Sequence, residues 1–304
     1  MKRHAILIIT VLLLASLPFS TRVSAVPGID KRWAVILCGY DMFQPDCQYL
    51  YDMIRAKFDG IYFLTDNASD PRIEWHPWWA SKSTLRHAIR DWIGNYSDGD
   101  DLVFIFIDSH GGGYNASTNI IVDATWELNS DEGQEICETD VGIDFNGNGV
   151  LEDTVWAGVD ECVSFEHCTE KYWDDDAKED LNWLAQNGKY GKLVFFSQFC
   201  YGGGFVRDLS AENRITISAS NETTPTYSYK ISEQPFRVEE YFSRPFINAL
   251  NLDEGFEEAD ADGNNLLSVW EAYQYAYDHD EARILGCETP QLYNFGLAAT
   301  TFLE

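Results

Sequence analysis

Two stretches of the chain share one pattern, in which an apolar run ends in a polar side chain that glycines follow. Residues 102–107 are all apolar and lead to His110 and three glycines, while residues 193–197 are apolar or small and lead to Cys200 and, after Tyr201, three more glycines. Continuous apolar runs of this length are typical of strands buried on both faces of a parallel sheet. Side chains at the carboxyl ends of neighbouring parallel strands meet at one edge of the sheet. The pattern therefore predicts that His110 and Cys200 emerge side by side.

The segments around these runs alternate between strand and helix patterns. Apolar runs predict further strands at 33–39, 61–66 and 214–220. Amphipathic periodicity predicts helices within 47–58, 81–93 and 180–186, the second of them capped by Ser81 or Ser83. This alternation predicts an α/β fold, with a mostly parallel sheet flanked by helices.

The side chains at the two strand ends suit acyl transfer, in which an imidazole activates a thiol. Each also has an ordinary interpretation. Cys200 would be a small buried residue or a disulfide partner, and His110 would be a loop residue. Their occurrence in the same structural position favours a catalytic pair over coincidence.

An apolar strand ending in His-Gly, and a later one ending in x-x-Cys-x-Gly, resemble the caspase-like cysteine peptidases of clan CD, most closely the legumain family. The resemblance covers roughly residues 32–228 and includes the opening strand RWAVILCGY. It implies a caspase-like fold and peptide bond hydrolysis through a thioester, with a peptide or protein as substrate. In this resemblance Cys200 is the nucleophile, His110 is the general acid/base, and the backbone N–H groups of Gly111 and Cys200 form the oxyanion hole.

The resemblance also locates a specificity pocket for the substrate residue on the acyl side of the scissile bond. Gln198, two residues before the nucleophile, would line it, and Thr223 and Thr224 in the segment 218–227 would face the substrate. Legumain has a glutamate at the position of Gln198, and its arginine after the first strand has no counterpart in 40–46. A neutral amide does not favour arginine or lysine, so we expect an uncharged or acidic substrate residue rather than strict asparagine cleavage.

Two other functions remain open at this point. A transamidase of the same family uses the same residues and intercepts the thioester with an amine. A secreted, non-catalytic calcium-binding protein would keep His110 and Cys200 only as structural residues. An unpaired, reactive Cys200 distinguishes the enzymes from the binding protein.

An acidic insertion is predicted between the two active-site strands. His110 and Cys200 are 90 positions apart (200 − 110), whereas the caspase signature has a separation of about 50, so we expect an insertion at about 123–180. It contains DFNGNGVLED, which has the alternating oxygen ligands of a calcium loop, although Val155 replaces the usual final glutamate. The candidate ligands there are Asp144, Asn146, Asn148, Val150 and Glu152.

A second calcium loop, closer to the EF-hand pattern, is predicted in DADGNNLLSVWE. Asn265 replaces the usual glycine at position 6, where a left-handed backbone is needed, and a helix at 269–277 follows. We expect a structural Ca²⁺ here. Its candidate ligands are Asp260, Asp262, Asn264, Leu266, Ser268 and Glu271.

The N-terminus has the features of a secretory signal peptide at 1–25: basic residues, a short apolar run and small residues before the cleavage point, with an uncleaved N-terminal anchor as the alternative. The expected organisation is then a peptidase domain at 26–250 and an EF-hand-like segment at 251–304 packed on it. Among the 304 residues, 50 are acidic and 21 basic, a net charge of −29. Cleavage removes three basic residues and brings the charge to about −32. This charge excludes nucleic acid and anionic lipid as partners and favours divalent cations, and no membrane insertion beyond the signal segment is expected.

Seven cysteines in an exported chain predict disulfides, and the odd number leaves at least one thiol unpaired, which a nucleophilic Cys200 explains. Cys137, Cys162 and Cys168 lie in one polar stretch. We expect at least one bridge within that stretch or from it to Cys287. The sequence does not determine the connectivity.

Overall fold

A computed structural model describes residues 29–65, 80–115, 120–123, 160–165, 168–231 and 234–303. The predicted signal peptide at 1–25 lies outside the described residues. The first predicted calcium loop, with Asp144, Asn146, Asn148, Val150 and Glu152, lies outside them too, as does Cys137.

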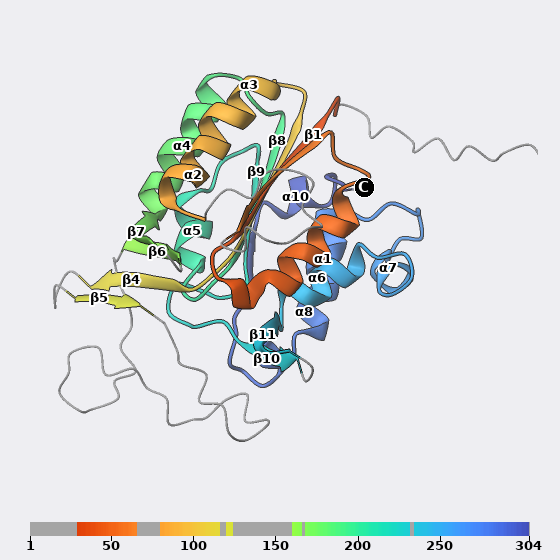
Figure 1. The fold of residues 1–304 in the computed structure, drawn as a ribbon. Coiled ribbons are helices and arrows are strands. Elements are labelled where there is room, and N and C mark those ends of the chain that lie inside the picture. The colour runs from red at the N-terminus through yellow and green to blue at the C-terminus, as the bar shows by residue number, and fades with distance from the viewer. Residues whose placement is uncertain are drawn as a thin grey trace, which may run out of the picture.

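A six-stranded sheet forms the centre of the molecule, in the order β12-β9-β8-β3-β1-β2 (Figure 1). All neighbours in it are parallel except β12, which is antiparallel to β9. The strands are β1 (Arg32–Cys38), β2 (Gly60–Thr65), β3 (Leu102–Asp108), β8 (Lys192–Gln198), β9 (Arg214–Ser218) and β12 (Gln291–Tyr293). The mostly parallel sheet predicted from the sequence is confirmed.

Helices cover both faces of this sheet (Figure 1). One face carries α2 (Lys82–Arg86), the π-helical η2 (His87–Ile93), α3 (Gly94–Tyr96), α4 (Asp174–Gln186) and α5 (Gly203–Asp208). The other carries α1 (Gln44–Ile54), α6 (Ser243–Ala249), α7 (Phe256–Ala259) and α8 (Val269–His279). Three short elements complete the helices: η1 (Asp41–Phe43), α9 (Glu281–Ile284) and α10 (Phe295–Ala298).

Alternate residues of the central strands pack into two separate cores. Phe104 and Phe106 of β3 belong to the core under α1 and α6, whereas Val103 and Ile105 belong to the core under α2 and α4. Both faces of β3 are fully buried, which explains why its sequence is continuously apolar.

The helix predicted at 81–93 is present as α2 and η2, and its start is set by a capping box. The Ser81 hydroxyl accepts the Thr84 N–H at 3.2 Å, and Thr84 Oγ1 accepts the Ser81 N–H at 3.1 Å. These bonds satisfy backbone donors that the first helical turn leaves without partners.

Two smaller sheets lie near the carboxyl end of the central strands (Figure 1). One has the order β5-β4-β6-β7, from β4 (Gly111–Asn115), β5 (Ile120–Asp123), β6 (Asp160–Phe165) and β7 (Cys168–Trp173). The other is the hairpin of β10 (Ser228–Ile231) and β11 (Gln234–Glu240). Strand β4 starts directly after His110, and it pairs with β6, which belongs to the region predicted as an insertion. The described part of that region therefore packs beside the edge where His110 and Cys200 lie.

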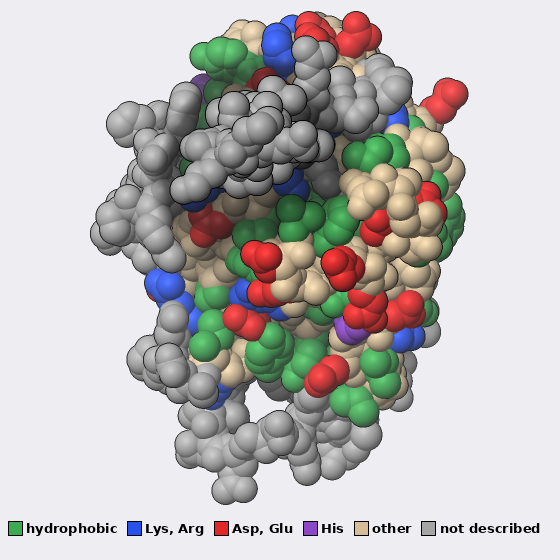
Figure 2. Space-filling view, turned by 90° about the vertical axis from the view of Figure 1, so that its right-hand side faces the viewer, with side chains coloured by type: hydrophobic (Ala, Val, Ile, Leu, Met, Phe, Trp, Pro, Cys, Tyr) green, Lys and Arg blue, Asp and Glu red, His purple; other side chains and the backbone are tan. Residues whose placement is uncertain are grey.

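The C-terminal segment shares the core of the sheet. Phe256, Leu267 and Val269 are buried in the same cluster as Phe104 and Phe106, and β12 extends the central sheet itself. Acidic side chains outnumber basic ones on the face that Figure 2 shows, and they are spread over it. In the described part of the chain, no helix has the length and hydropathy needed to span a bilayer.

Candidate active site

The carboxyl ends of β1, β3 and β8 are in register. Asp108 lies opposite Cys38 on one side and opposite Gln198 on the other. Backbone bonds continue the pairing beyond the strands, because the Ser109 N–H donates to the Gln198 carbonyl at 3.1 Å. His110 and Cys200 each stand two residues after this shared row, so the predicted parallel neighbours do bring both to one edge.

Gly111 brings the two active-site segments into direct contact. A Cβ atom on Gly111 would lie 2.0 Å from the Cys200 carbonyl oxygen and 2.9 Å from its amide nitrogen. Only glycine allows the backbones to approach so closely. The contact joins the residue after the histidine to the cysteine itself, the pair to which the family resemblance assigns the oxyanion hole.

Cys200 is 6% exposed, and its thiol lies against Thr226. The Thr226 N–H donates to the sulfur at 3.3 Å, and the Thr226 hydroxyl lies 3.6 Å from it. Burial raises the pKa of the Cys200 thiol, and the contacts with Thr226 offset only part of this rise. The thiol is therefore protonated at neutral pH, and its attack on a carbonyl requires a base.

The His110 ring is half-buried and is held by two aromatic rings from the loop after β1. Its centroid lies 4.6 Å from that of Tyr40 and 5.1 Å from that of Phe43, with interplanar angles of 72° and 75°. These edge-on contacts fix the imidazole at the end of β3. They also give the loop at 40–46 a role in positioning the histidine.

The turn after Cys200 has a strained backbone. Tyr201 has a φ of 64°, a left-handed conformation that costs a residue with a side chain about 1–3 kcal/mol. The Tyr201 N–H donates to the Thr224 carbonyl at 3.0 Å, and the Gly202 N–H donates to Ser220 Oγ at 3.1 Å. These bonds hold the turn that projects Cys200 from the end of β8.

The predicted substrate residues occupy different positions in this loop. Thr223 is exposed and bonds the Asn221 side chain at 2.8 Å. Thr224 holds the Tyr201 backbone through its carbonyl, and its hydroxyl accepts the Asn221 N–H at 3.2 Å. Thr226, which the sequence reasoning did not select, is the threonine that contacts the thiol. Nothing in SASNETTPTY distinguishes it before the loop is folded.

Gln198, the third predicted substrate residue, lies in a buried acidic cluster that we define as Asp46, Asp108, Gln198 and Glu240. The Gln198 amide donates to Glu240 Oε2 at 3.0 Å, and Asp46 Oδ2 accepts the Glu240 N–H at 2.8 Å. Arg244 forms an ion pair with Asp46 at 2.7 Å. Burial raises the pKa of Asp46 to about 6 and the pKa values of Asp108 and Glu240 well above their usual range.

The second predicted calcium loop has the backbone that its sequence requires. One carboxylate oxygen from each of Asp260, Asp262 and Glu271 lies within 4.8 Å of the other two. Asn265, at position 6 of the loop, has a φ of 60°, the left-handed conformation predicted for it. The Asn264 N–H donates to Asp260 Oδ1 at 3.2 Å. Three carboxylates gathered on a preformed turn suit a hard cation.

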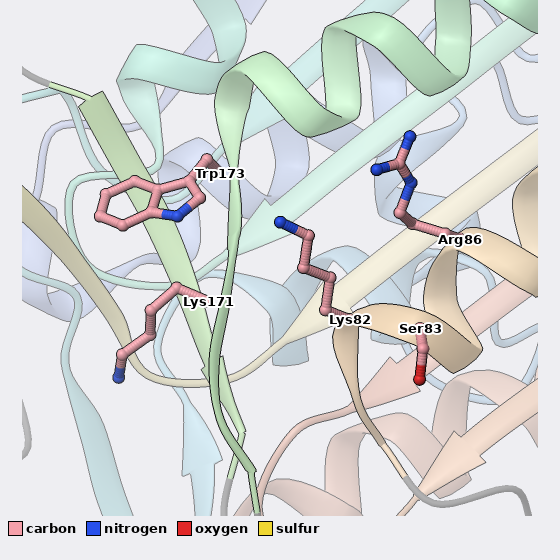
Figure 3. A pocket seen from close by; sticks show the side chains of 5 residues that line it. All are labelled: Lys82, Ser83, Arg86, Lys171 and Trp173. Atoms are coloured by element: carbon pink, nitrogen blue, oxygen red, sulfur yellow. The ribbon is translucent and has the colours of Figure 1, made fainter.

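A separate hollow is formed on α2 and β7 and does not include either predicted catalytic residue (Figure 3). It is lined by Lys82, Ser83, Arg86, Lys171 and Trp173. Lys82 is paired with Asp176 at 2.7 Å, and Arg86 with Asp180 at 3.0 Å. Two of its cations thus already have carboxylate partners within the protein.

Comparison with known proteins bears on this site. A model of the Peptidase C13 family matches residues 157–278, less than half of the chain, and the match includes Cys200 but not His110. The crystal structure of protein GSU0716 from Geobacter sulfurreducens is similar, with a TM-score of 0.50 and 14% identity, covering 90% of this chain and 100% of that one. At this identity the likeness concerns the fold alone. No protein with curated annotation matches the sequence.

Proposed function

Since the chain is related to the legumain family of caspase-like cysteine peptidases, we propose that it is a cysteine endopeptidase that uses Cys200 and His110. The observation that carries the proposal is the register of β3 and β8, which places both residues two positions beyond one shared row. The contact of Gly111 with the Cys200 backbone supports it, because it puts two backbone N–H groups beside the nucleophile.

The proposed reaction has two steps. In the first, His110 takes the thiol proton as sulfur attacks the substrate carbonyl, and then donates that proton to the leaving amine as the C–N bond breaks. In the second, His110 takes a proton from water, which attacks the thioester, and the C–S bond breaks to restore the thiol. The N–H groups of Gly111 and Cys200 stabilise the oxyanion in both steps.

A peptide library with every residue type on the acyl side of the scissile bond tests the proposal, with products identified by mass spectrometry. Cleavage at defined sites is expected. If the calcium-loaded protein cleaves no peptide of the library, the result would favour a non-catalytic calcium-binding protein. Adding an amine acceptor separates hydrolysis from transamidation, because a transamidase joins the acceptor to the acyl fragment and a peptidase releases a free carboxylate.

We also propose that the loop of Asp260, Asp262, Asn264, Leu266, Ser268 and Glu271 binds a structural Ca²⁺. The convergence of its carboxylates and the left-handed Asn265 support this. The loop precedes α8, whose Val269 and Ala272 are buried in the core, so an ion here would stabilise the whole domain.

Removal of calcium is expected to lower the melting temperature by about 5 °C. A ligand at 100 times its Kd raises the free energy of unfolding by about 2.7 kcal/mol. Dividing this free energy by an unfolding entropy of about 2.1 cal/mol/K per residue gives a change of about 5 °C in the melting temperature of a chain of this size. Glu271→Gln should abolish the calcium effect and still cap α8, since glutamine serves in a capping box. Glu257→Gln on the exposed side of α7 is the control.

Scanning calorimetry with and without a chelator measures this shift. An equal melting temperature in both conditions would refute the calcium site. Native mass spectrometry counts the ions: one if only this loop binds, and two if the loop of Asp144, Asn146, Asn148, Val150 and Glu152 binds as well.

The proposal includes export, for which the signal-like segment 1–25 is the support. Cys287 is disulfide-bonded, whereas Cys38, Cys47 and Cys200 are free thiols. A disulfide fits an oxidising compartment, and a free Cys200 fits its role as nucleophile. N-terminal sequencing of the exported protein is expected to begin at Val26. A mature chain that retains residues 1–25 would contradict cleavage.

A further inference from the structure

The buried acidic cluster lies directly beneath the catalytic pair. Asp108 and Gln198 are register partners, and His110 and Cys200 follow them by two residues. Two residues span about 7 Å along a strand. The His110 ring packs on Phe43 of the α1-side core, and Asp108 faces Asp46 and Cys47 of α1 on that same side. The Glu240 carboxyl is also near enough to Cys200 to raise the pKa of its thiol, so the cluster lies about one side-chain length below the pair.

The cluster presents hydrogen-bond acceptors that lack donors. Asp108 is fully buried, and neither of its carboxylate oxygens has a hydrogen-bond partner. The Gln198 side chain is 1% exposed, and its amide oxygen also has none, because its nitrogen is the atom bonded to Glu240. A buried polar group without a partner is costly, and each such group in a folded protein requires an explanation.

The cluster holds more carboxyl groups than cations. Asp108 faces Cys38 of β1, Asp46 and Cys47 of α1, Glu240 of β11 and Arg244 of α6. Arg244 is the one cation among these groups, and it is shared between Asp46 and Glu239, each at 2.7 Å. The carboxylates of Asp108 and Glu240 therefore have no cation of their own among the groups that face them.

We propose that Asp108 and Glu240, with the Gln198 amide oxygen, receive the arginine or lysine side chain of the substrate residue whose carbonyl Cys200 attacks. This inference rests on the proposed peptidase function. A guanidinium or ammonium group offers only donors, and its charge favours the ionised form of both carboxyl groups. In water the same cation gains far less from a carboxylate, so the buried position provides the selectivity.

A basic substrate residue is the reverse of the preference expected from Gln198 alone. A neutral amide two residues before the nucleophile predicts an uncharged or acidic substrate residue, but the acidic groups around Gln198 set the charge that a substrate side chain would meet. Asp46 and Glu240 are 194 positions apart in the sequence and come together only in the fold.

Matched substrates that carry arginine or citrulline at the cleavage position test the inference, because citrulline has nearly the same shape and no charge. The ratio of kcat/KM for arginine over citrulline is expected to be about 100, the size of a buried charge-assisted hydrogen bond. Asp108→Asn should lower this ratio at least tenfold. An arginine-to-citrulline ratio near 1, with either substrate still cleaved, would overturn the inference and leave the peptidase intact; a failure to cleave any substrate would instead refute the proposed function.

Stability provides a second readout that needs no catalysis. The pKa of Asp108 is raised by burial, so its contribution to stability is complete below its unfolded pKa and is lost as the pH rises through the folded value. Asp108→Asn removes this titration. We therefore expect the variant to melt above the wild type, by a margin that grows as the pH rises from 4.

Asp180→Asn is the matched control. Asp180 is as buried as Asp108, but it accepts bonds from Tyr172 and Arg86, at 3.0 and 3.1 Å, and also from Arg90. Its replacement should lower the melting temperature and leave the arginine-to-citrulline ratio unchanged. A fall in melting temperature for Asp108→Asn like that for Asp180→Asn would show that Asp108 is a structural residue and overturn the inference.

Binding of the cation itself is measured in Cys200→Ala, which cannot turn over. Agmatine, a free guanidinium compound, is expected to raise the melting temperature of Cys200→Ala and to have no effect on the Cys200→Ala/Asp108→Asn double variant. An equal shift in both proteins would contradict the assignment of Asp108.

Discussion

Replacing Cys200 with alanine is expected to lower kcat/KM for peptide hydrolysis by about 10⁴-fold or more, because no other group can form the thioester. His110→Ala should cause a loss of similar size. The buried Cys200 thiol has a raised pKa and is protonated at neutral pH, so it depends on an adjacent base to become a nucleophile. The double variant should be no worse than either single one, since the two groups act as a unit.

His87→Ala is the control for this prediction. His87 lies on the surface and pairs with Asp91 at 2.8 Å, and its loss should leave the rate constants unchanged. Steady-state kinetics of the purified variants, at matched melting temperatures, give the comparison. Hydrolysis by His110→Ala at near the wild-type rate would contradict the role of His110 and point to another base.

Gly111→Ala is expected to reduce kcat by about 10²–10³-fold, the loss typical of one missing oxyanion donor. The new Cβ would lie 2.0 Å from the Cys200 carbonyl oxygen, a backbone atom that cannot rotate away. Relief of this clash must move β4 away from the nucleophile. The N–H of residue 111 then moves away from the position proposed for the oxyanion.

Gly296→Ala is the matched glycine control. A Cβ at Gly296, in α10, has no neighbour within 4 Å, so this change should leave both activity and stability at or above wild-type values. Parallel measurements of kcat and melting temperature separate the effects. If Gly111→Ala kept the wild-type kcat, the close approach of Gly111 and Cys200 would have no part in catalysis.

The strands, and the position of His110 and Cys200 at one edge of the sheet, could be predicted from the sequence because they depend on local patterns. The run at 102–107 is buried on both faces, and a continuously apolar sequence is the direct result. Likewise, Asn265 was expected to be left-handed because its place in the loop requires it, and its φ of 60° confirms this. In both cases the signal lies within a few adjacent residues.

The walls of the site could not be predicted, since they depend on segments that are distant in sequence. Thr226 contacts the thiol only because of the turn that follows Cys200. Glu240 contacts Gln198 from the hairpin of β10 and β11, which no apolar run in the sequence predicted. Gln198 considered alone therefore predicted an uncharged or acidic substrate residue, whereas the acidic groups around it in the fold support a basic one.

The cysteine count also gave only part of the answer. Cys38 and Cys47 are free and fully buried, where they pack as small apolar residues in the core beneath the sheet. Six cysteines remain when Cys200 is set aside, but this even number did not require all six to form disulfides. The position of Cys200 at the strand end, rather than the odd cysteine count, is therefore the ground on which we propose it as the nucleophile.

Covalent labelling with a peptide electrophile tests the central claim most directly. The calcium-loaded protein is treated with the probe, and the modified residue is located by mass spectrometry. We expect one adduct, at Cys200, which forms in His87→Ala at the wild-type rate and is lost in His110→Ala. A probe that modified Cys38 or Cys47 while Cys200 stayed free, or that labelled Cys200 equally well without His110, would contradict the catalytic pair.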